Sequence, residues 1–358
     1  MKTYLVTGGA GFIGTNFIYH LFEKYGNNIR IINYDKLTYA GNLENLSKIP
    51  VDYIKNKNYI FIKGDICNDK ELSILFNTYN PDIVVNFAAE SHVDRSISNA
   101  RDFIKTNIEG THTLLEVAKN KWLNKNKWEK SKLFLHISTD EVYGELGKSG
   151  CFSETTPIAP RSPYSASKAS ADMIVKSYFS TFKMPVIISR CSNNYGPYQF
   201  PEKFIPLIIN NCLNNRKIPV YGDGKNIRDW IYIEDHIRAI NIIIEKGKPG
   251  EIYNIGGQNE IDNINLVKNI IDIIAKQTGI NINYSLVKFV KDRPGHDYRY
   301  AMNISKIANE LKWKPKYSFI EGIGKTINWY IANRNWLNEI VNGEYMEYYK
   351  NMYENRMG

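Results

Sequence analysis

The chain has few cysteines, and they lie far apart. Its 358 residues include Cys67, Cys151, Cys191 and Cys212. None forms a C-x-x-C pair, and no histidine stands near any of them at the spacing of metal ligands. This pattern argues against a disulfide framework and against a bound metal, and it favours reduced thiols in the cytoplasm.

The sequence also lacks long apolar runs, low-complexity tracts and internal repeats. No run approaches the roughly 18 residues that a membrane helix needs. The stretch MKTYLVTGGAGFIG reaches its glycines too soon for a signal peptide. We therefore expect a soluble, cytoplasmic protein with no membrane partner. An apolar share of 43% and a charged share of 23% are typical of a globular chain, here long enough for two lobes.

The formal net charge of +9 raises the question of a nucleic-acid partner. The densest basic stretch, residues 119–132, interleaves lysines with Trp122 and Trp128. A solvated helix end explains this stretch more simply, because lysines also stabilise the C-terminal end of a helix dipole. Lysine is abundant throughout the chain, so we predict no nucleic-acid partner.

Strand-like apolar runs alternate with helical patterns through the first half. They are TYLVT (3–7), IRIIN (29–33), YIFIK (59–63), DIVVNFA (82–88), LFLHIS (133–138) and VIISR (186–190). This alternation predicts an α/β fold with a doubly wound parallel sheet, the Rossmann fold. After residue 190 the pattern becomes irregular, and helical stretches resume at about 233–245 and 263–276. We predict a Rossmann domain over 1–190 and a smaller, partly interleaved α/β lobe over 191–358.

A glycine-rich loop follows the first predicted strand directly. In LVTGGAGFIGTNFI, Gly9, Gly11 and Gly14 have the G-x-G-x-x-G spacing, and Gly8 adds G-x-x-G-x-x-G. Such glycines let the backbone approach a pyrophosphate, which the helix N-terminus then binds through its amides and dipole. About 20 residues further on, Asp35 ends the second strand, where it can bind a ribose 2′-hydroxyl and repel a 2′-phosphate. The combination predicts NAD rather than NADP.

Other residues of the predicted cofactor site follow later strands. GDI (64–66) is placed to frame the adenine, and FAAES (87–91) to line the pyrophosphate and nicotinamide ribose, because ligands of open α/β sheets bind beyond the carboxyl ends of the strands. We assign to the cofactor site Gly8, Gly11, Phe12, Ile13, Gly14, Asp35, Lys36, Thr38, Asp65, Ile66, Phe87, Ala88, Ala89, Ser91, Thr106, Tyr164, Lys168 and Asn194.

Tyr164 and Lys168 in YSASK lie four residues apart in a helical stretch and so share one face. A phenol becomes a usable base when a lysine ammonium and the positive nicotinamide of NAD stabilise its phenolate. Thr139 ends the preceding strand, and Asp140 and Glu141 follow it. Two adjacent carboxylates suit paired acid and base roles, because their repulsion and burial raise one of the two pKa values.

These motifs resemble the extended short-chain dehydrogenase/reductase superfamily. YDKLTYAGN, AAESHVDRSI, STDEVYG, RCSNNYGPYQFPEKFIP, RDWIYIEDH and DRPGHDYRYAMN resemble its dTDP-glucose 4,6-dehydratase family nearly end to end, as does the tail GEYMEYY. At one position the chain differs, with Tyr298 where an arginine is usual. The resemblance implies a hydro-lyase of deoxysugar biosynthesis that uses NAD, and a homodimer formed by helices at about 100–121 and 163–182.

The resemblance also implies a mechanism. Tyr164 and NAD oxidise carbon 4 of the glucose of dTDP-glucose, while Thr139 binds the carbon 4 oxygen. Glu141 then removes the carbon 5 proton, protonated Asp140 gives a proton to the departing carbon 6 hydroxyl, and hydride returns to carbon 6. The catalytic residues are therefore Thr139, Asp140, Glu141, Tyr164 and Lys168. The implied substrate site comprises Ser91, Thr139, Asp140, Glu141, Asn193, Lys203, Phe204, Pro219, Tyr221, Arg228, Asn263, Arg293 and His296.

Two alternatives stay open at this stage. The first is a UDP-sugar 4-epimerase, or a 4,6-dehydratase for another nucleotide sugar; simple epimerisation would leave Asp140 and Glu141 without chemistry. The second is an NAD-sensing or nucleic-acid-binding protein on a retired dehydrogenase scaffold, against which the complete set of Thr139, Tyr164 and Lys168 argues. A lone histidine after a strand, His92, is more often structural, so we leave it out of the catalytic set.

Overall fold

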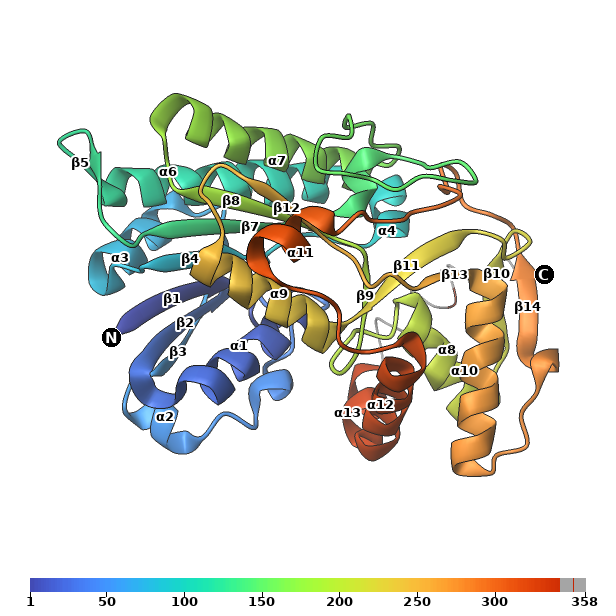
Figure 1. The fold of residues 1–358 in the computed structure, drawn as a ribbon. Coiled ribbons are helices and arrows are strands. Elements are labelled where there is room, and N and C mark those ends of the chain that lie inside the picture. The colour runs from blue at the N-terminus through green and yellow to red at the C-terminus, as the bar shows by residue number, and fades with distance from the viewer. Residues whose placement is uncertain (342–349, 351–358) are drawn as a thin grey trace.

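The structure, a computed structural model, describes residues 1–341 and Lys350. Its centre is a seven-stranded sheet with the order β12-β8-β7-β4-β1-β2-β3, and every neighbouring pair is parallel. Figure 1 shows this sheet running across the molecule. Its strands are β1 (Lys2–Thr7), β2 (Ile29–Asp35), β3 (Tyr59–Lys63), β4 (Ile83–Asn86), β7 (Leu133–Thr139), β8 (Val186–Cys191) and β12 (Ile252–Ile255).

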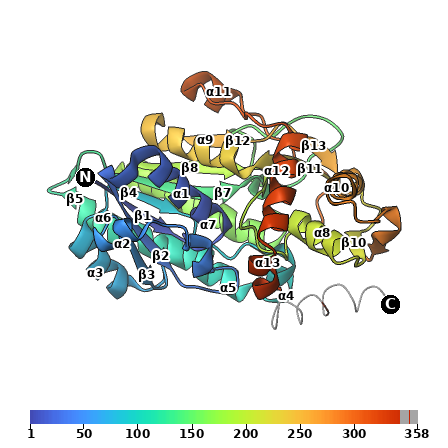
Figure 2. The ribbon, with the colours of Figure 1, turned by 90° about the horizontal axis from the view of Figure 1, so that it is seen from below.

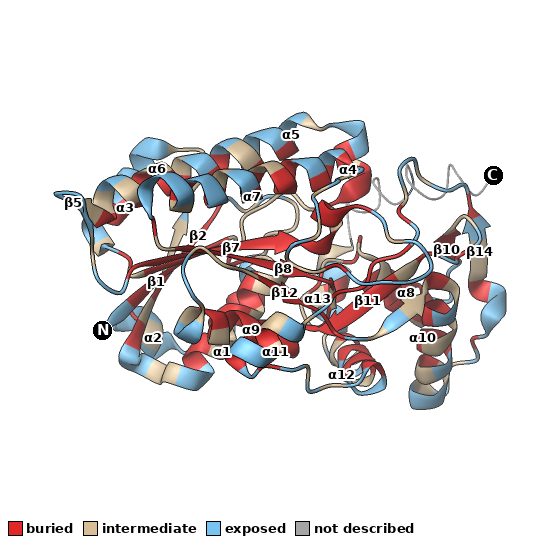
Figure 3. Ribbon diagram, turned by 45° about the horizontal axis from the view of Figure 1, so that its top comes forward, coloured by how far each residue is buried: buried red, intermediate tan, exposed pale blue. Residues whose placement is uncertain are grey.

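Helices cover both faces of the sheet. On one face α1 (Phe12–Tyr25) and α9 (Ile233–Lys246) pack together, and on the other α3 (Asp69–Tyr79), α6 (Thr111–Trp122) and α7 (Pro163–Phe182) form a layer (Figure 1). Two apolar clusters fill the spaces between sheet and helices. Figure 3 shows the strands buried and the outward helix faces exposed, as expected of a sheet covered on both sides.

A second group of elements lies beyond the carboxyl ends of the main strands (Figure 2). It contains a three-stranded sheet in the order β13-β11-β9 and a parallel pair, β10 and β14. Its elements are β9 (Asn193–Tyr195), α8 (Phe204–Leu213), β10 (Ile218–Tyr221), β11 (Ile227–Tyr232), β13 (Glu260–Asp262), α10 (Asn263–Thr278), β14 (Val287–Val290), α12 (Phe319–Ala332) and α13 (Arg334–Ile340).

The remaining elements are short. They are α2 (Val51–Lys55), α4 (Val93–Ser98), α5 (Arg101–Phe103), α11 (Ser305–Leu311), the hairpin strands β5 (Leu123–Asn124) and β6 (Lys127–Trp128), the 3-10 turns η1 (Gly26–Asn28), η2 (Leu43–Leu46), η4 (Asp140–Tyr143) and η5 (Tyr284–Leu286), and the π-helical segment η3 (Ile104–Gly110).

The predicted fold class and the six predicted strands are confirmed. A seventh strand, β12, comes from the 191–358 segment and extends the sheet beside β8. The helix predicted at 163–182 begins and ends where expected, whereas the one predicted at 100–121 is divided into α5, η3 and α6. The division of domains at residue 190 stays a prediction, and the GEYMEYY tail lies outside the described residues.

The basic stretch 119–132 forms the end of α6 and the β5–β6 hairpin. Its two tryptophans pack against the protein. Trp122 is fully buried and donates to the Pro81 carbonyl, while the Trp128 indole donates to the Phe182 carbonyl. The tryptophans therefore anchor the hairpin and do not present stacking faces between the lysines. Within residues 1–341, none of the helices is long and apolar enough to cross a bilayer.

Candidate active site

A cavity lies where the strands of the central sheet end. It has a volume of about 310 Å³ and is lined from the glycine loop and from the ends of β2, β3, β4, β7 and β8. Every residue that we assigned to the cofactor site lines it, and so do all five predicted catalytic residues. The topology explains this convergence, because parallel strands bring their carboxyl ends to one edge of the sheet.

The glycine loop has the shape that a dinucleotide needs. Gly8 has a φ of +69°, and a Cβ there would lie 2.7 Å from the backbone nitrogen of Ala88. A Cβ on Gly14 would lie 2.4 Å from the Gly8 carbonyl oxygen. Gly11 is the N-cap of α1 and offers no side-chain cap, so the first-turn amides remain available for a phosphate.

Asp35 closes the ribose end of the cavity. Its carboxylate accepts backbone N–H groups from Ala10 at 2.9 Å and Leu37 at 2.8 Å, which ties the glycine loop to the end of β2. The neighbouring Lys36 forms an ion pair with Asp65 at 2.9 Å. Lys36 is therefore already neutralised, and the carboxylate of Asp35 sets the charge at this end of the cavity. The arrangement suits an unphosphorylated ribose.

Tyr164 and Lys168 project from the first turns of α7 into the same cavity. The Lys168 ammonium donates to the Ile137 carbonyl at 2.7 Å, and the Thr139 hydroxyl donates to Asp140 at 3.1 Å. Burial, followed by the charges of Glu141 and Asp140, raises the pKa of Tyr164 well above its usual value. The protein's own groups do not make this phenol a base. The positive charge that favours its phenolate has to come in part from a bound ligand.

Asp140 and Glu141 form the turn η4 directly after β7, and both line the cavity. Burial and the adjacent Glu141 raise the pKa of Asp140 well above its usual range. Burial also raises the pKa of Glu141, but Arg293, Arg228 and Lys203 oppose that rise. The two neighbours are thus electrostatically different. These surroundings favour Asp140 as the proton donor and Glu141 as the proton acceptor, the roles that the resemblance implies and that stay a prediction.

The cations around Glu141 come from the second group of elements. Arg228 lies over the Tyr300 ring at 4.3 Å and donates to the carbonyls of Ile227 and Asp297. Arg293 faces Asp94, with 3.6 Å between Nη1 and Oδ1. Neither arginine forms an ion pair with the aspartate next to it in the sequence. Such a pair would have made both arginines ordinary surface residues.

Other predicted substrate residues cluster near Arg293. Tyr221 donates to Asp94 at 3.1 Å, its ring meets His296 edge-on at 6.1 Å, and Lys203 donates to the Ser91 carbonyl at 2.7 Å. Asn193 lines the cavity. Seven predicted substrate residues lie outside the cavity lining, namely Phe204, Pro219, Tyr221, Arg228, Asn263, Arg293 and His296.

His92 is buried at the N-terminus of α4. Burial and the nearby cations Lys203, Arg95 and Arg293 lower its pKa well below the usual value. The imidazole is therefore neutral, and His92 does not line the cavity; its exclusion from the catalytic set stays a prediction. Across residues 1–341, the structure shows no group of three or more His, Cys, Asp or Glu side chains that could hold a metal ion.

Sequence reasoning missed several residues of the site. One is Glu202, a buried carboxylate that accepts from Tyr39 at 2.9 Å and pairs with Arg95 at 3.2 Å. A charged pair inside the apolar run FPEKFIP was the signal for it. The cavity lining that we did not assign comprises Tyr34, Ala40, Gly41, Gly64, Glu90, Ile137, Ser138, Cys191, Ser192, Gln199, Phe200 and Glu202.

Comparison with known proteins fits this geometry. The profile of the family described as GDP-mannose 4,6 dehydratase matches residues 5–326. The dTDP-glucose 4,6-dehydratase of Salmonella typhimurium is 47% identical over 363 residues, which cover 98% of this chain and 99% of that protein. The chain belongs to the dTDP-glucose 4,6-dehydratase family.

Solved structures of dTDP-glucose 4,6-dehydratases share the fold as well. The enzyme from Bacillus anthracis, in complex with NAD, is 45% identical with a TM-score of 0.84, covering 95% of this chain and all of that one. The enzyme from Streptomyces venezuelae, with NAD and TYD bound, is 42% identical with a TM-score of 0.86, covering 94% and 99%. The family resemblance thus extends to the three-dimensional fold over almost the whole length.

Proposed function

We propose that this protein is an NAD-dependent hydro-lyase that converts dTDP-glucose into dTDP-4-keto-6-deoxyglucose. The observation that carries the proposal is the pair Asp140 and Glu141. They are adjacent in the dinucleotide cavity, Asp140 buried and Glu141 partly buried, with different electrostatic surroundings. Membership of the dTDP-glucose 4,6-dehydratase family supports the same reaction. An epimerase would need no acid and base pair at this position.

In the oxidation at carbon 4, side chains of this protein accept the proton of the carbon 4 hydroxyl and bind its oxygen. Bound NAD supplies the hydride acceptor and donor. Tyr164 takes the proton of the carbon 4 hydroxyl. The Thr139 hydroxyl, which donates to Asp140 in the structure, turns to donate to the carbon 4 oxygen when substrate is bound. Lys168 holds positive charge on the same helix face, where it favours the phenolate. Burial of these groups excludes water from the exchange.

In the elimination, the two carboxyl groups act in turn. A ketone at carbon 4 acidifies the carbon 5 proton, and Glu141 accepts that proton because the surrounding cations favour its ionised form. Asp140, kept protonated by burial and by Glu141, donates its proton to the carbon 6 hydroxyl, which leaves as water. One proton is taken and one is given, so the elimination is balanced. Return of the hydride to carbon 6 and of a proton from Glu141, which can exchange with solvent, to carbon 5 would then give the product.

We assign the nucleotide diphosphate to the cationic groups beside the cavity. Arg228 is buried, Arg293 is partly buried, and both act on Glu141, which lines the cavity. A guanidinium suits a diphosphate because its planar fork makes two parallel hydrogen bonds. Tyr221, His296 and Lys203 complete this proposed site.

Incubation of the purified protein separately with dTDP-glucose and with UDP-glucose tests reaction and substrate together. We expect dTDP-glucose to yield a product lighter by one water, and to carry one solvent deuterium at carbon 5 when the reaction runs in deuterated water. UDP-glucose should react much more slowly. An unchanged mass with inversion at carbon 4 would show an epimerase instead.

We also propose that the protein forms a homodimer through the outer face of α7 and the neighbouring helices α4 and η3. These helices contact one another and leave apolar side chains exposed, with Met173 44% exposed, Ile97 40% and Ile104 49%. An exposed apolar patch on packed helices favours association with a second copy.

Light scattering after size exclusion tests the dimer. The wild type should have twice the mass of one chain, and Met173→Glu should lower the dimer fraction because it buries a charge in the contact. Ile320→Glu is the matched control, since Ile320 is 60% exposed on α12. A monomeric wild type, or equal loss of dimer in both variants, would reject this interface.

We also propose that the protein is cytoplasmic. We propose as well that the segments before and after about residue 190 have different functions. The four cysteines are free, which supports a reducing compartment. The dinucleotide cavity draws mainly on residues 8–168, and the arginines assigned to the diphosphate come from residues 228–293. The 191–358 segment would thus supply the nucleotide-sugar site.

A further inference from the structure

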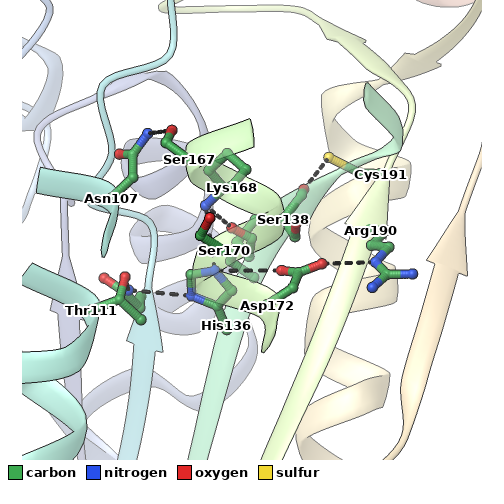
Figure 4. A network of polar contacts seen from close by, with 12 residues as sticks. Asn107, Thr111, His136, Ser138, Ser167, Lys168, Ser170, Asp172, Arg190 and Cys191 are labelled. Carbon is green, nitrogen blue, oxygen red and sulfur yellow. Dashed lines mark hydrogen bonds and ion pairs between the residues drawn. The ribbon is translucent and has the colours of Figure 1, made fainter. Parts of the chain in front are cut away.

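A chain of buried polar side chains lies behind Lys168, outside the cavity. It consists of His136 on β7, Asp172 on α7 and Arg190 on β8 (Figure 4). All three are at most 1% exposed, and none of them lines the cavity. They therefore touch neither cofactor nor substrate, and the proposed mechanism gives them no task.

The sequence places one member in register with the catalytic residues. Tyr164, Lys168 and Asp172 follow one another at intervals of four in YSASKASAD. Residues at this interval share one face of a helix, and all three lie in the single helix α7. The face that carries the phenol and the ammonium thus continues into a carboxylate one turn further from the cavity.

Of the two carboxylate oxygens of Asp172, one accepts a hydrogen bond and the other has no hydrogen-bond partner. Its Oδ2 accepts from Arg190 Nε at 2.8 Å, and Arg190 lies on the side away from His136 and Lys168 (Figure 4). Its Oδ1 is buried with no hydrogen-bond partner and faces His136 Nε2 at 3.7 Å. That same nitrogen lies 3.5 Å from Lys168 Nζ. Asp172 Oδ1 and Lys168 Nζ therefore both lie next to His136 Nε2, and the unpaired carboxylate oxygen faces the ammonium across this edge of the imidazole.

The hydrogen bonds of Asn86 fix the state of His136. Asn86 Oδ1 accepts from the Thr7 hydroxyl at 2.6 Å, so its amide Nδ2 is the group that donates to His136 Nδ1 at 3.3 Å. A neutral imidazole that accepts at Nδ1 carries its proton on Nε2. Burial and the charges of Lys168 and Arg190 lower the pKa of His136 and keep it neutral. The Nε2 proton is directed to Asp172, and His136 cannot accept from Lys168.

A buried ion pair of this kind costs free energy that an apolar pair of similar size would not. Asp172 and Arg190 have no ligand to bind, so their place next to Lys168 needs another reason. We propose that Asp172 is a positioning residue of the dehydration: its carboxylate, fixed by Arg190, keeps Lys168 protonated and facing Tyr164. This inference rests on the proposed function, in which Lys168 acts as a cation.

The charges around Lys168 agree with this role. Burial lowers the pKa of Lys168 to about 8, and Asp172 is the first charge that opposes the fall, followed by Cys191. The other titratable groups in the vicinity are Tyr164 on α7, His136 on β7, Arg190 on β8, and Asp140 and Glu141 on η4. From η3 and α6 come the uncharged Asn107 and Thr111 (Figure 4).

The test is the pH dependence of NAD reduction by dTDP-glucose in the first turnover of Asp172→Asn. Asparagine keeps the shape and one acceptor but removes the charge, so Lys168 should lose its proton at a lower pH. We expect the basic limb of the rate profile to move down by about one pH unit, the lower end of the effect of one adjacent charge. The rate deficit should grow with pH and be small at the acidic end.

Two further variants separate this role from a merely structural one. Asp172→Glu restores the charge and should restore the wild-type basic limb, even if the variant is less stable. Asp172→Asn combined with Arg190→Met removes both charges, so no unpaired ion remains buried to prevent folding. Its basic limb should also move down. If the basic limb stays in place both in Asp172→Asn and in the double variant, Asp172 is structural only.

Nuclear magnetic resonance of lysine side chains in the protein without substrate gives an independent readout. The Lys168 signal, assigned by its absence in Lys168→Arg, should titrate at a lower pH in Asp172→Asn than in the wild type. Equal titration in both would overturn the inference while the dehydration activity stands. Absence of dehydration in the wild type would instead overturn the proposed function, and the titration shift could still be measured.

Discussion

Tyr164→Phe is expected to prevent even the first reduction of bound NAD by dTDP-glucose. The proposed mechanism gives the carbon 4 proton to the Tyr164 hydroxyl, and loss of a general base typically slows the step by about 10²- to 10⁴-fold. Phenylalanine preserves the ring and its edge contact with Phe103 at 6.2 Å. The fold and the binding of dTDP-glucose should therefore change little.

Stopped-flow absorbance of NADH in a single turnover measures this step. Tyr178→Phe is a matched control on the same helix, because it removes a tyrosine hydroxyl that bonds to Glu116 far from the cavity. The control should reduce NAD at close to the wild-type rate. A Tyr164→Phe protein that still accumulates NADH at that rate would exclude Tyr164 as the base.

The glycine loop shows why the cofactor site was predictable from sequence. Gly8 and Gly14 leave room that any Cβ would fill, and Asp35 follows at the distance that one strand, helix and strand impose. All of this is local, within a single βαβ unit. The sequence left open whether Lys36 adds positive charge at the ribose end of the site. Its partner Asp65 follows the next strand, and only the folded sheet brings the two together.

The substrate side depends more on tertiary structure. Asp94 on α4 meets Tyr221 on β10 and Arg293 after β14, and no periodicity connects positions so far apart. The resemblance supplied Tyr221 and Arg293 but not their aspartate partner. Glu202 was missed although it interrupts the apolar run FPEKFIP, because its partners Tyr39 and Arg95 come from distant parts of the sequence.

The role proposed for Asp172 could be predicted only in part from the sequence. The spacing Y-x-x-x-K-x-x-x-D is visible in the sequence, and a helix of twenty residues was predicted over it. An aspartate one turn after a lysine is usually a solvated i,i+4 partner. Its meaning changes only when β7 and β8 bury it between His136 and Arg190. Helical spacing identifies neighbours, but the layer packed on the helix determines whether water screens them.

Glu141→Gln is expected to stop the reaction after the oxidation at carbon 4. Glutamine keeps the size of the side chain and loses the ability to accept a proton, whereas Tyr164, Lys168 and Thr139 remain. NADH should therefore form within about tenfold of the wild-type rate and then persist. Exchange of the carbon 5 hydrogen with deuterated water should fall by about 10²- to 10⁴-fold, the range for loss of a general base.

Asp140→Asn provides the contrast that assigns the two carboxyl groups. If Glu141 is the base and Asp140 the acid, this variant should reduce NAD and exchange the carbon 5 hydrogen, yet release water slowly. Mass spectrometry of the sugar nucleotide after quenching distinguishes the two blocks, because only exchange adds deuterium before water is lost. Rapid exchange in Glu141→Gln together with none in Asp140→Asn would reverse the roles. Their electrostatic surroundings favour the first assignment, since the cations Arg228, Arg293 and Lys203 oppose the pKa rise of Glu141, while Glu141 adds to that of Asp140.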